Sequence, residues 1–170
     1  IDDFAPGGVR AEAAGEDNYH YFSAAQYPVK VRSQDLRAEG LLDDDGNLTP
    51  GLYFADTKFE LSGTLLGTEG VTFVARDSLS MSCSQCYFTK WEPQLLFFAL
   101  RGDPGACNVT AISISASETQ WYGLVYAPYG GVSISSSGNL AVWGSIVAYT
   151  VDLSGSEIEV HYRPELDPPI

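Results

Sequence analysis

Basic residues are scarce in this sequence. Nine Lys and Arg stand against 22 Asp and Glu, which gives a formal net charge of −13. Nucleic-acid phosphates require a basic face, and anionic membranes attract polybasic segments. We therefore expect no nucleic-acid partner and no docking on an anionic bilayer. The acidic surface is most simply explained as a device for solubility.

Long apolar runs are missing as well. No stretch approaches the roughly 18 consecutive apolar residues that a membrane-spanning helix needs, so we expect no direct membrane insertion by this segment. The chain begins at Ile1, without an initiator Met or a signal peptide. This beginning predicts a mature product or an excised ectodomain, and hence an extracellular or cell-surface location.

The sequence contains only two histidines, His20 and His161. A serine nucleophile needs a base, and no Gly-x-Ser-x-Gly elbow accompanies the abundant serines. Outward positions of the expected strands are mostly Ser and Thr, so paired catalytic carboxylates are not evident either. We predict a protein that is not an enzyme and that uses no cofactor.

Helix signals are also rare. Residues 9–14 and 33–42 are the only candidates, and at most one short helix is expected. The rest of the chain alternates apolar and polar residues with period two, as half-buried strands do. At 170 residues, rich in aromatics and glycine, the chain predicts one ordered, β-rich domain.

A short sequence motif recurs through these strands. Segments that end in alanine alternate with segments that end in serine. Once two insertions are set aside, the motif repeats about every twenty residues. The members are Ala55, Ala75, Ala99, Ala127 and Ala148, and Ser62, Ser82, Ser115, Ser135 and Ser154. Self-similarity at this period is typical of a solenoid.

We therefore predict an all-β fold: a right-handed parallel β-helix of about six coils with loop insertions and end caps. Leu61, Met81, Ile114, Ile134 and Leu153 would form one inward ladder. A β-sandwich is the alternative, but its hairpins should be rich in Asn-Gly or Asp-Gly turns, which are scarce here.

Places where the spacing of the repeat changes indicate the expected domain organisation. Residues 1–170 would form a single solenoid domain, with an N-terminal cap or edge at 1–25 and a C-terminal cap at 160–170. Loop excursions are expected at 34–50, 83–92 and 101–110. Before the first excursion, 29–32 would be a degenerate strand of the serine type, and 19–24 an earlier strand of the alanine type.

All three cysteines lie in or beside two of these excursions. Alternation places Cys83 with Leu79 and Met81 on the inward face, so Cys86 and Cys107 are the favoured disulfide pair. Cys83 with Cys107 is the alternative. A zinc site would need further ligands, and a thioredoxin-type site would need a βαβ setting.

An acidic turn offers a weak metal candidate. Asp43, Asp45 and Asn47 have the alternate spacing of a calcium loop, but the glycine and the twelfth-position glutamate of such a loop are missing. A solvated acidic turn is the simpler interpretation. Asn47 and Asn108 each begin a glycosylation sequon, which fits an exported protein.

Three tryptophans offer a possible surface stripe. Trp121 and Trp143 lie 22 residues apart, which would place them in adjacent coils as a core ladder or as a glycan-stacking stripe. The acidic residues Asp152, Glu157 and Glu159 near the C-terminus could contribute to such a site or protect the last edge. A glycan-binding or glycan-cleaving β-helix is therefore the alternative function. An ice-binding solenoid is disfavoured, because its threonine ladders are absent.

Several phrases resemble a known family. They are 3–8 (DFAPGG), 50–54 (PGLYF), 121–130 (WYGLVYAPYG), 144–148 (GSIVA) and 153–156 (LSGS). In this order they resemble the β-helical ectodomains of bacterial Tad/Flp pilus-assembly proteins. The resemblance implies a structural or adhesive role at the cell surface or on a pilus, and it implies no catalytic residues.

Together these observations predict a non-enzymatic, extracellular structural protein. It would be a cell-surface or filament-associated subunit, whose partners are further copies of itself or other surface and pilus proteins. Unpaired backbone groups at an end coil would provide the template for self-assembly.

Overall fold

The computed structural model describes residues 1–102 and 109–161. Strands hold 62% of the structure, so the chain is broadly all-β, as expected. The elements are η1 (Asp2–Phe4), α1 (Val9–Ala14), β1 (Tyr19–Phe22), β2 (Val31–Arg32), α2 (Ser33–Ala38), β3 (Gly51–Ala55), β4 (Phe59–Ala75), β5 (Leu79–Lys90), β6 (Leu95–Ala99), β7 (Thr110–Ser136), β8 (Asn139–Ser154) and β9 (Glu157–His161).

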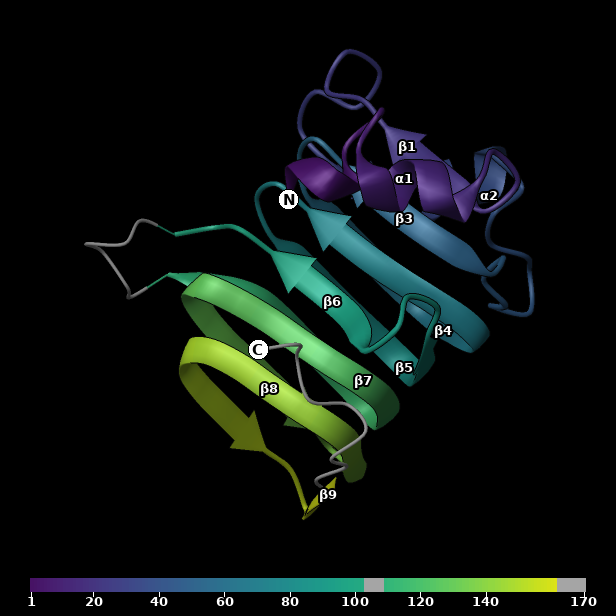
Figure 1. Cartoon of the computed structure of the whole chain (residues 1–170). Coiled ribbons are helices and arrows are strands. Elements are labelled where there is room, and N and C mark those ends of the chain that lie inside the picture. The colour runs from purple at the N-terminus through teal and green to yellow at the C-terminus, as the bar shows by residue number, and fades with distance from the viewer. Residues whose placement is uncertain (103–108, 162–170) are drawn as a thin grey trace.

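Pairing between the named strands is parallel throughout. The recurring segments lie side by side: Ser62 pairs with Ser82, and Ser82 with Ser115. Ala55 likewise pairs with Ala75. Figure 1 shows the strands stacked one beside another from β1 to β9. Register is set by the inward side chains, because a slip of one residue would turn each apolar set toward water.

The prediction of a right-handed β-helix of about six coils is wrong. β4 pairs with both β5 and β6, and β7 pairs with the same two strands, so these four close into a parallel barrel. The other strands attach outside this ring. The physical reason is strand length: β4 and β7, with 17 and 27 residues, meet different partners along their course.

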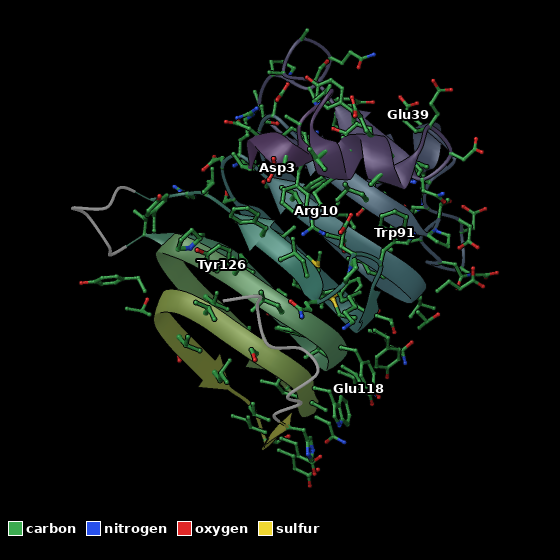
Figure 2. All side chains as sticks on the ribbon, in the orientation of Figure 1. Asp3, Arg10, Glu39, Trp91, Glu118 and Tyr126 are labelled. Carbon is green, nitrogen blue, oxygen red and sulfur yellow. A yellow bond between two sulfur atoms is a disulfide. The ribbon has the colours of Figure 1, made fainter. Side chains whose placement is uncertain are left out.

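The N-terminal part of the sheet is buried on both faces. Tyr53 points into the main core, whereas Leu52 and Phe54 pack with Ala14 of α1 in a second, smaller apolar cluster. All five residues of β3 are buried in consequence. Arg10 of α1 (Figure 2) donates to the buried carboxylate of Glu92 at 2.7 Å, which ties the helix to the segment between β5 and β6.

The part of the chain that the structure describes contains two α-helices, one more than expected. α2 buries Leu36 in the main core, and Leu42 and Leu48 from the following segment are buried with it. In Figure 1 both helices lie at the β1 end of the sheet. The early strands expected at 19–24 and 29–32 are confirmed as β1 and β2. The main core is therefore covered at its N-terminal end.

The loop expected at 83–92 is mostly strand. Residues up to Lys90 belong to β5, where Cys83 pairs with Ala116 and Tyr87 with Gln120. The excursion at 34–50 contains α2 and the acidic turn. Most of the excursion at 101–110 and of the cap at 160–170 lies outside the described residues.

The opposite end of the core is open among the described residues. Leu140 and Val142 of β8 are fully buried, but their β9 partners Ile158 and Val160 are 42% and 55% exposed. Val151 is also exposed, although its partner Val132 in β7 is buried. Apolar side chains that lie beside buried core residues are thus exposed to solvent at this end. Within residues 1–102 and 109–161, no helix is long and apolar enough to cross a bilayer.

Candidate functional site

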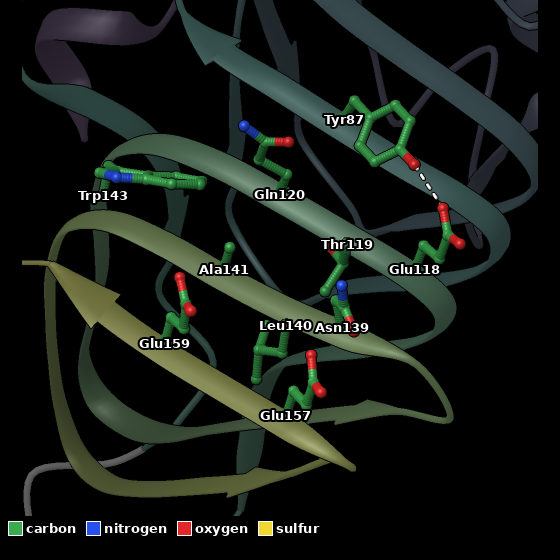
Figure 3. Close-up of a pocket in the computed structure, with 10 residues that line it drawn as sticks. All are labelled: Tyr87, Glu118, Thr119, Gln120, Asn139, Leu140, Ala141, Trp143, Glu157 and Glu159. Carbon is green, nitrogen blue, oxygen red and sulfur yellow. Dashed lines mark hydrogen bonds between the residues drawn. The ribbon is translucent and has the colours of Figure 1, made fainter.

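A groove crosses the outer face of β7, β8 and β9. Because the three strands are parallel and in register, Gln120, Ala141 and Glu159 follow one another across them. Ala141 is the short member of this row, and the hollow of about 290 Å³ lies around it (Figure 3). The walls are Tyr87, Glu118, Thr119, Gln120, Asn139, Leu140, Trp143, Glu157 and Glu159.

Hydrogen bonds hold several wall residues in place. The hydroxyl of Tyr87 donates to Glu118 at 2.6 Å, and this bond raises the pKa of Tyr87 above its usual value. Tyr87 therefore remains a protonated donor at neutral pH. The amide Nε2 of Gln120 donates to the hydroxyl of Tyr122 at 2.8 Å, which orients its carbonyl oxygen as an acceptor.

The groove is acidic. Three carboxylates, from Glu118, Glu157 and Glu159, share it with the amides of Gln120 and Asn139, and none of the described lining residues is Lys or Arg. Such walls accept hydrogen bonds from hydroxyl or ammonium groups and repel phosphate or carboxylate ligands. The arrangement suits a neutral or amine-bearing polar ligand.

An aromatic stack forms one border of the groove. The indole of Trp143 lies parallel to the ring of Tyr122, with centroids 4.8 Å apart, and to the ring of His161 at 5.3 Å. His161 also contacts Glu159, with 3.1 Å between Nε2 and Oε2. Both faces of the indole are thus covered, and the groove meets only its edge.

The expected Trp121–Trp143 stripe does not exist. Trp121 is fully buried in the main core, and its strand partner in β8 is Val142. Trp143 pairs instead with Tyr122, one residue further along β7. Adjacent residues of a strand point to opposite faces, so the two indoles lie on opposite sides of the sheet. Neither indole presents a free face for stacking on a sugar.

The structure pairs the cysteines differently from the prediction. A disulfide joins Cys83 to Cys86, with Cα atoms 5.9 Å apart. The expected bond between Cys86 and Cys107 is therefore wrong, as is the Cys83–Cys107 alternative; Cys107 itself lies outside the described residues. The cause is a register shift: Gly63 faces Cys83 while Leu65 faces Cys86, so β5 carries an extra residue. This bulge brings both sulfur atoms to the buried side.

The acidic turn is held by its own hydrogen bonds. Asn47 donates to Asp43 from its backbone nitrogen at 2.7 Å and from its side-chain amide at 2.8 Å. These bonds lower the pKa of Asp43. In the described residues no three acidic, His or Cys side chains gather as metal ligands, Asp45 included. Asn47 is exposed, and the other sequon residue, Asn108, lies outside the described residues.

Sequence reasoning missed the groove and the aromatic stack. A signal was present, because Ala127 and Ala148 are 21 residues apart and pair in the structure. The same separation of 21 residues places Trp143 beside Tyr122. Of the three acidic residues near the C-terminus, Glu157 and Glu159 line the groove, whereas Asp152 pairs with Ser133 away from it.

No protein-family model matches this chain, and no curated protein or solved structure shows significant similarity to it. The resemblance to Tad/Flp pilus-assembly ectodomains therefore rests on the sequence phrases alone.

Proposed function

We propose that this protein is a non-enzymatic extracellular structural protein, a cell-surface or pilus- or filament-associated subunit that associates with a second copy of itself. The observation that carries the proposal is the open C-terminal end of the core. Among the described residues nine large apolar side chains are exposed, and three of them, Val151, Ile158 and Val160, continue rows of buried core residues. Apolar surface gathered in one region is typical of an interaction face.

Two further features support the extracellular setting. The Cys83–Cys86 disulfide belongs to an oxidising compartment, because cytosolic thiols are kept reduced. The net charge of −13 with few basic residues keeps such a protein soluble without binding nucleic acid.

The asymmetry of the two ends refines the mode of association. The N-terminal end of the core is covered by Leu36, Leu42 and Leu48, whereas the β9 end is open among the described residues. End-to-end stacking into a filament would require both ends to be open. Pairing of two β9 ends requires neither helix to move.

Light scattering on size-exclusion fractions, from low micromolar to millimolar chain, tests the proposal. We expect a dimer whose fraction rises with concentration, and electron microscopy should show short particles rather than long fibres. A mass that stays monomeric over the whole range would overturn self-association.

The groove around Ala141 favours a second function, the binding of a glycan. Its amide and carboxylate walls offer hydrogen bonds to sugar hydroxyls, although no indole face is free for stacking. Titration calorimetry with neutral and amino oligosaccharides tests this function. Ala141→Met would fill the hollow and abolish binding, whereas Ala25→Met, at an exposed site remote from the groove, would not. Absence of heat with every sugar would exclude the function for those glycans.

A further inference from the structure

β9, the last strand among the described residues, has the properties of a self-pairing edge. Within the described part of the chain it pairs on one side only, with β8. All five of its side chains are exposed. A strand in this position presents backbone N–H and C=O groups that can accept another strand.

We propose that β9 pairs antiparallel with β9 of a second copy, about a two-fold axis through Glu159. This inference rests on the proposed self-association and specifies its interface. An isologous two-fold contact uses the same surface on both subunits, so its sequence must be complementary to itself. The segment Glu157–His161 meets this condition.

Apolar side chains match across the axis. Antiparallel pairing about Glu159 places Ile158 opposite Val160 of the second copy, and Val160 opposite Ile158. Both side chains lie next to the buried core residues Leu140 and Val142. The contact would therefore cover the open end of both cores with one continuous apolar layer, and burying apolar area stabilises it.

Polar side chains decide the strand direction. In the antiparallel pair Glu157 lies opposite His161 of the second copy, whose imidazole can donate to the carboxylate. Glu159 is the only residue of the segment that lies opposite the same residue of the second copy. Parallel in-register pairing would instead place Glu157 opposite Glu157 and Glu159 opposite Glu159 of the second copy. Like charges directly opposite one another are destabilising. Charge therefore favours the antiparallel arrangement.

A cysteine at the axis tests the geometry directly. Opposed residues of antiparallel strands have Cα atoms about 4.5–5.5 Å apart, which a disulfide can bridge. Glu159→Cys in a Cys107→Ser background should give a covalent dimer on mild oxidation. Val147→Cys, an exposed position on β8, is the matched control and should stay largely monomeric on a denaturing non-reducing gel.

A second variant guards against loss of folding. Glu159→Gln removes the like-charge contact at the axis, so it should lower the dimer dissociation constant several-fold, and added salt should strengthen the unmodified dimer. Val160→Lys should weaken the dimer at least tenfold, while Val29→Lys, at an exposed position remote from β9, should not.

The outcomes separate the two proposals. A concentration-dependent dimer in which Glu159→Cys fails to cross-link, or in which Glu159→Gln has no effect, would overturn the β9 interface and leave self-association standing. A chain that is monomeric at every concentration would overturn both.

Discussion

Tyr122 and Trp143 stack with their rings only 9° from parallel, although 21 positions separate them in the chain. Parallel register places one directly beside the other on β7 and β8. His161 extends the stack on β9, so three strands that border the groove are joined by one column of rings.

Removing the central ring should weaken the C-terminal layer. We expect Trp143→Ala to lower the free energy of unfolding by about 2 kcal/mol, since each aromatic pair contributes about 0.5–1.5 kcal/mol beyond burial. His161→Ala, which removes one neighbour, should cost roughly half as much. Urea unfolding of both variants and of the double variant measures the coupling. Strict additivity of the two losses would show that the rings do not interact.

Gly144 is held where no side chain fits. Its φ is +152°, and a Cβ atom would stand 2.2 Å from the carbonyl oxygen of its partner Gly123. We expect Gly144→Ala to cost about 3 kcal/mol, from backbone strain and a clash that only main-chain movement relieves. Gly40→Ala, just after α2, is the control: its φ is +74° but the space is open, so strain alone should cost about 1 kcal/mol. Equal losses in thermal unfolding would contradict the clash.

The Cys83–Cys86 disulfide closes a loop of four residues. Loop-closure entropy for so short a loop corresponds to about 2 kcal/mol. Reduction should therefore lower the unfolding midpoint modestly without abolishing the fold. Mass spectrometry of alkylated, unreduced protein checks the pairing: the peptide that carries both residues should remain unlabelled. Alkylation of Cys83 with Cys86 bridged to Cys107 would contradict this pairing.

Stability should depend on the protonation of His20. Burial lowers the pKa of this imidazole from its usual 6.5, and the hydrogen bond to the Pro50 carbonyl opposes the shift only in part. Between the two pKa values the unfolded chain binds more protons than the native one. The free energy of unfolding should therefore decrease as the pH falls through 6.5 toward the native pKa.

Comparison of variants isolates this contribution, because the net charge of the whole chain also changes with pH. The stability of the native protein relative to His20→Gln should fall between pH 7.5 and 5, measured by urea unfolding. Ala25→Gln, at an exposed position without a titratable side chain, serves as the control and should keep the native slope. A slope shared by the native chain and His20→Gln would assign the pH dependence to other groups.

The pairing of the recurring segments could be predicted because it follows from local pattern. Alternation in 112–115 and 132–135 identifies the buried face, and recurrence identifies which strands share a register. Ser62, Ser82 and Ser115 accordingly pair as the recurring motif indicated. Their inward neighbours Leu61, Met81 and Ile114 are buried in one core.

The candidate site could not be predicted in the same way. A one-residue difference between spacings of 22 and 21 decides whether Trp143 lies over Trp121 or over Tyr122, and so on which face it lies. The bulge beside Gly63 likewise turns Cys86 inward. Such shifts depend on how each strand bends against its neighbour, which the spacing of residues does not record.

The sequence by itself determined that this chain is β-rich, acidic and built from recurring strands, because alternation, composition and period are properties of short segments. Only the tertiary structure decided that four strands close into a barrel and that Trp121 is core while Trp143 borders a groove. It also decided that the core of the described residues is covered at α2 but open at β9. These features arise from long-range contacts, whose free energy depends on which surfaces meet after the strands have paired.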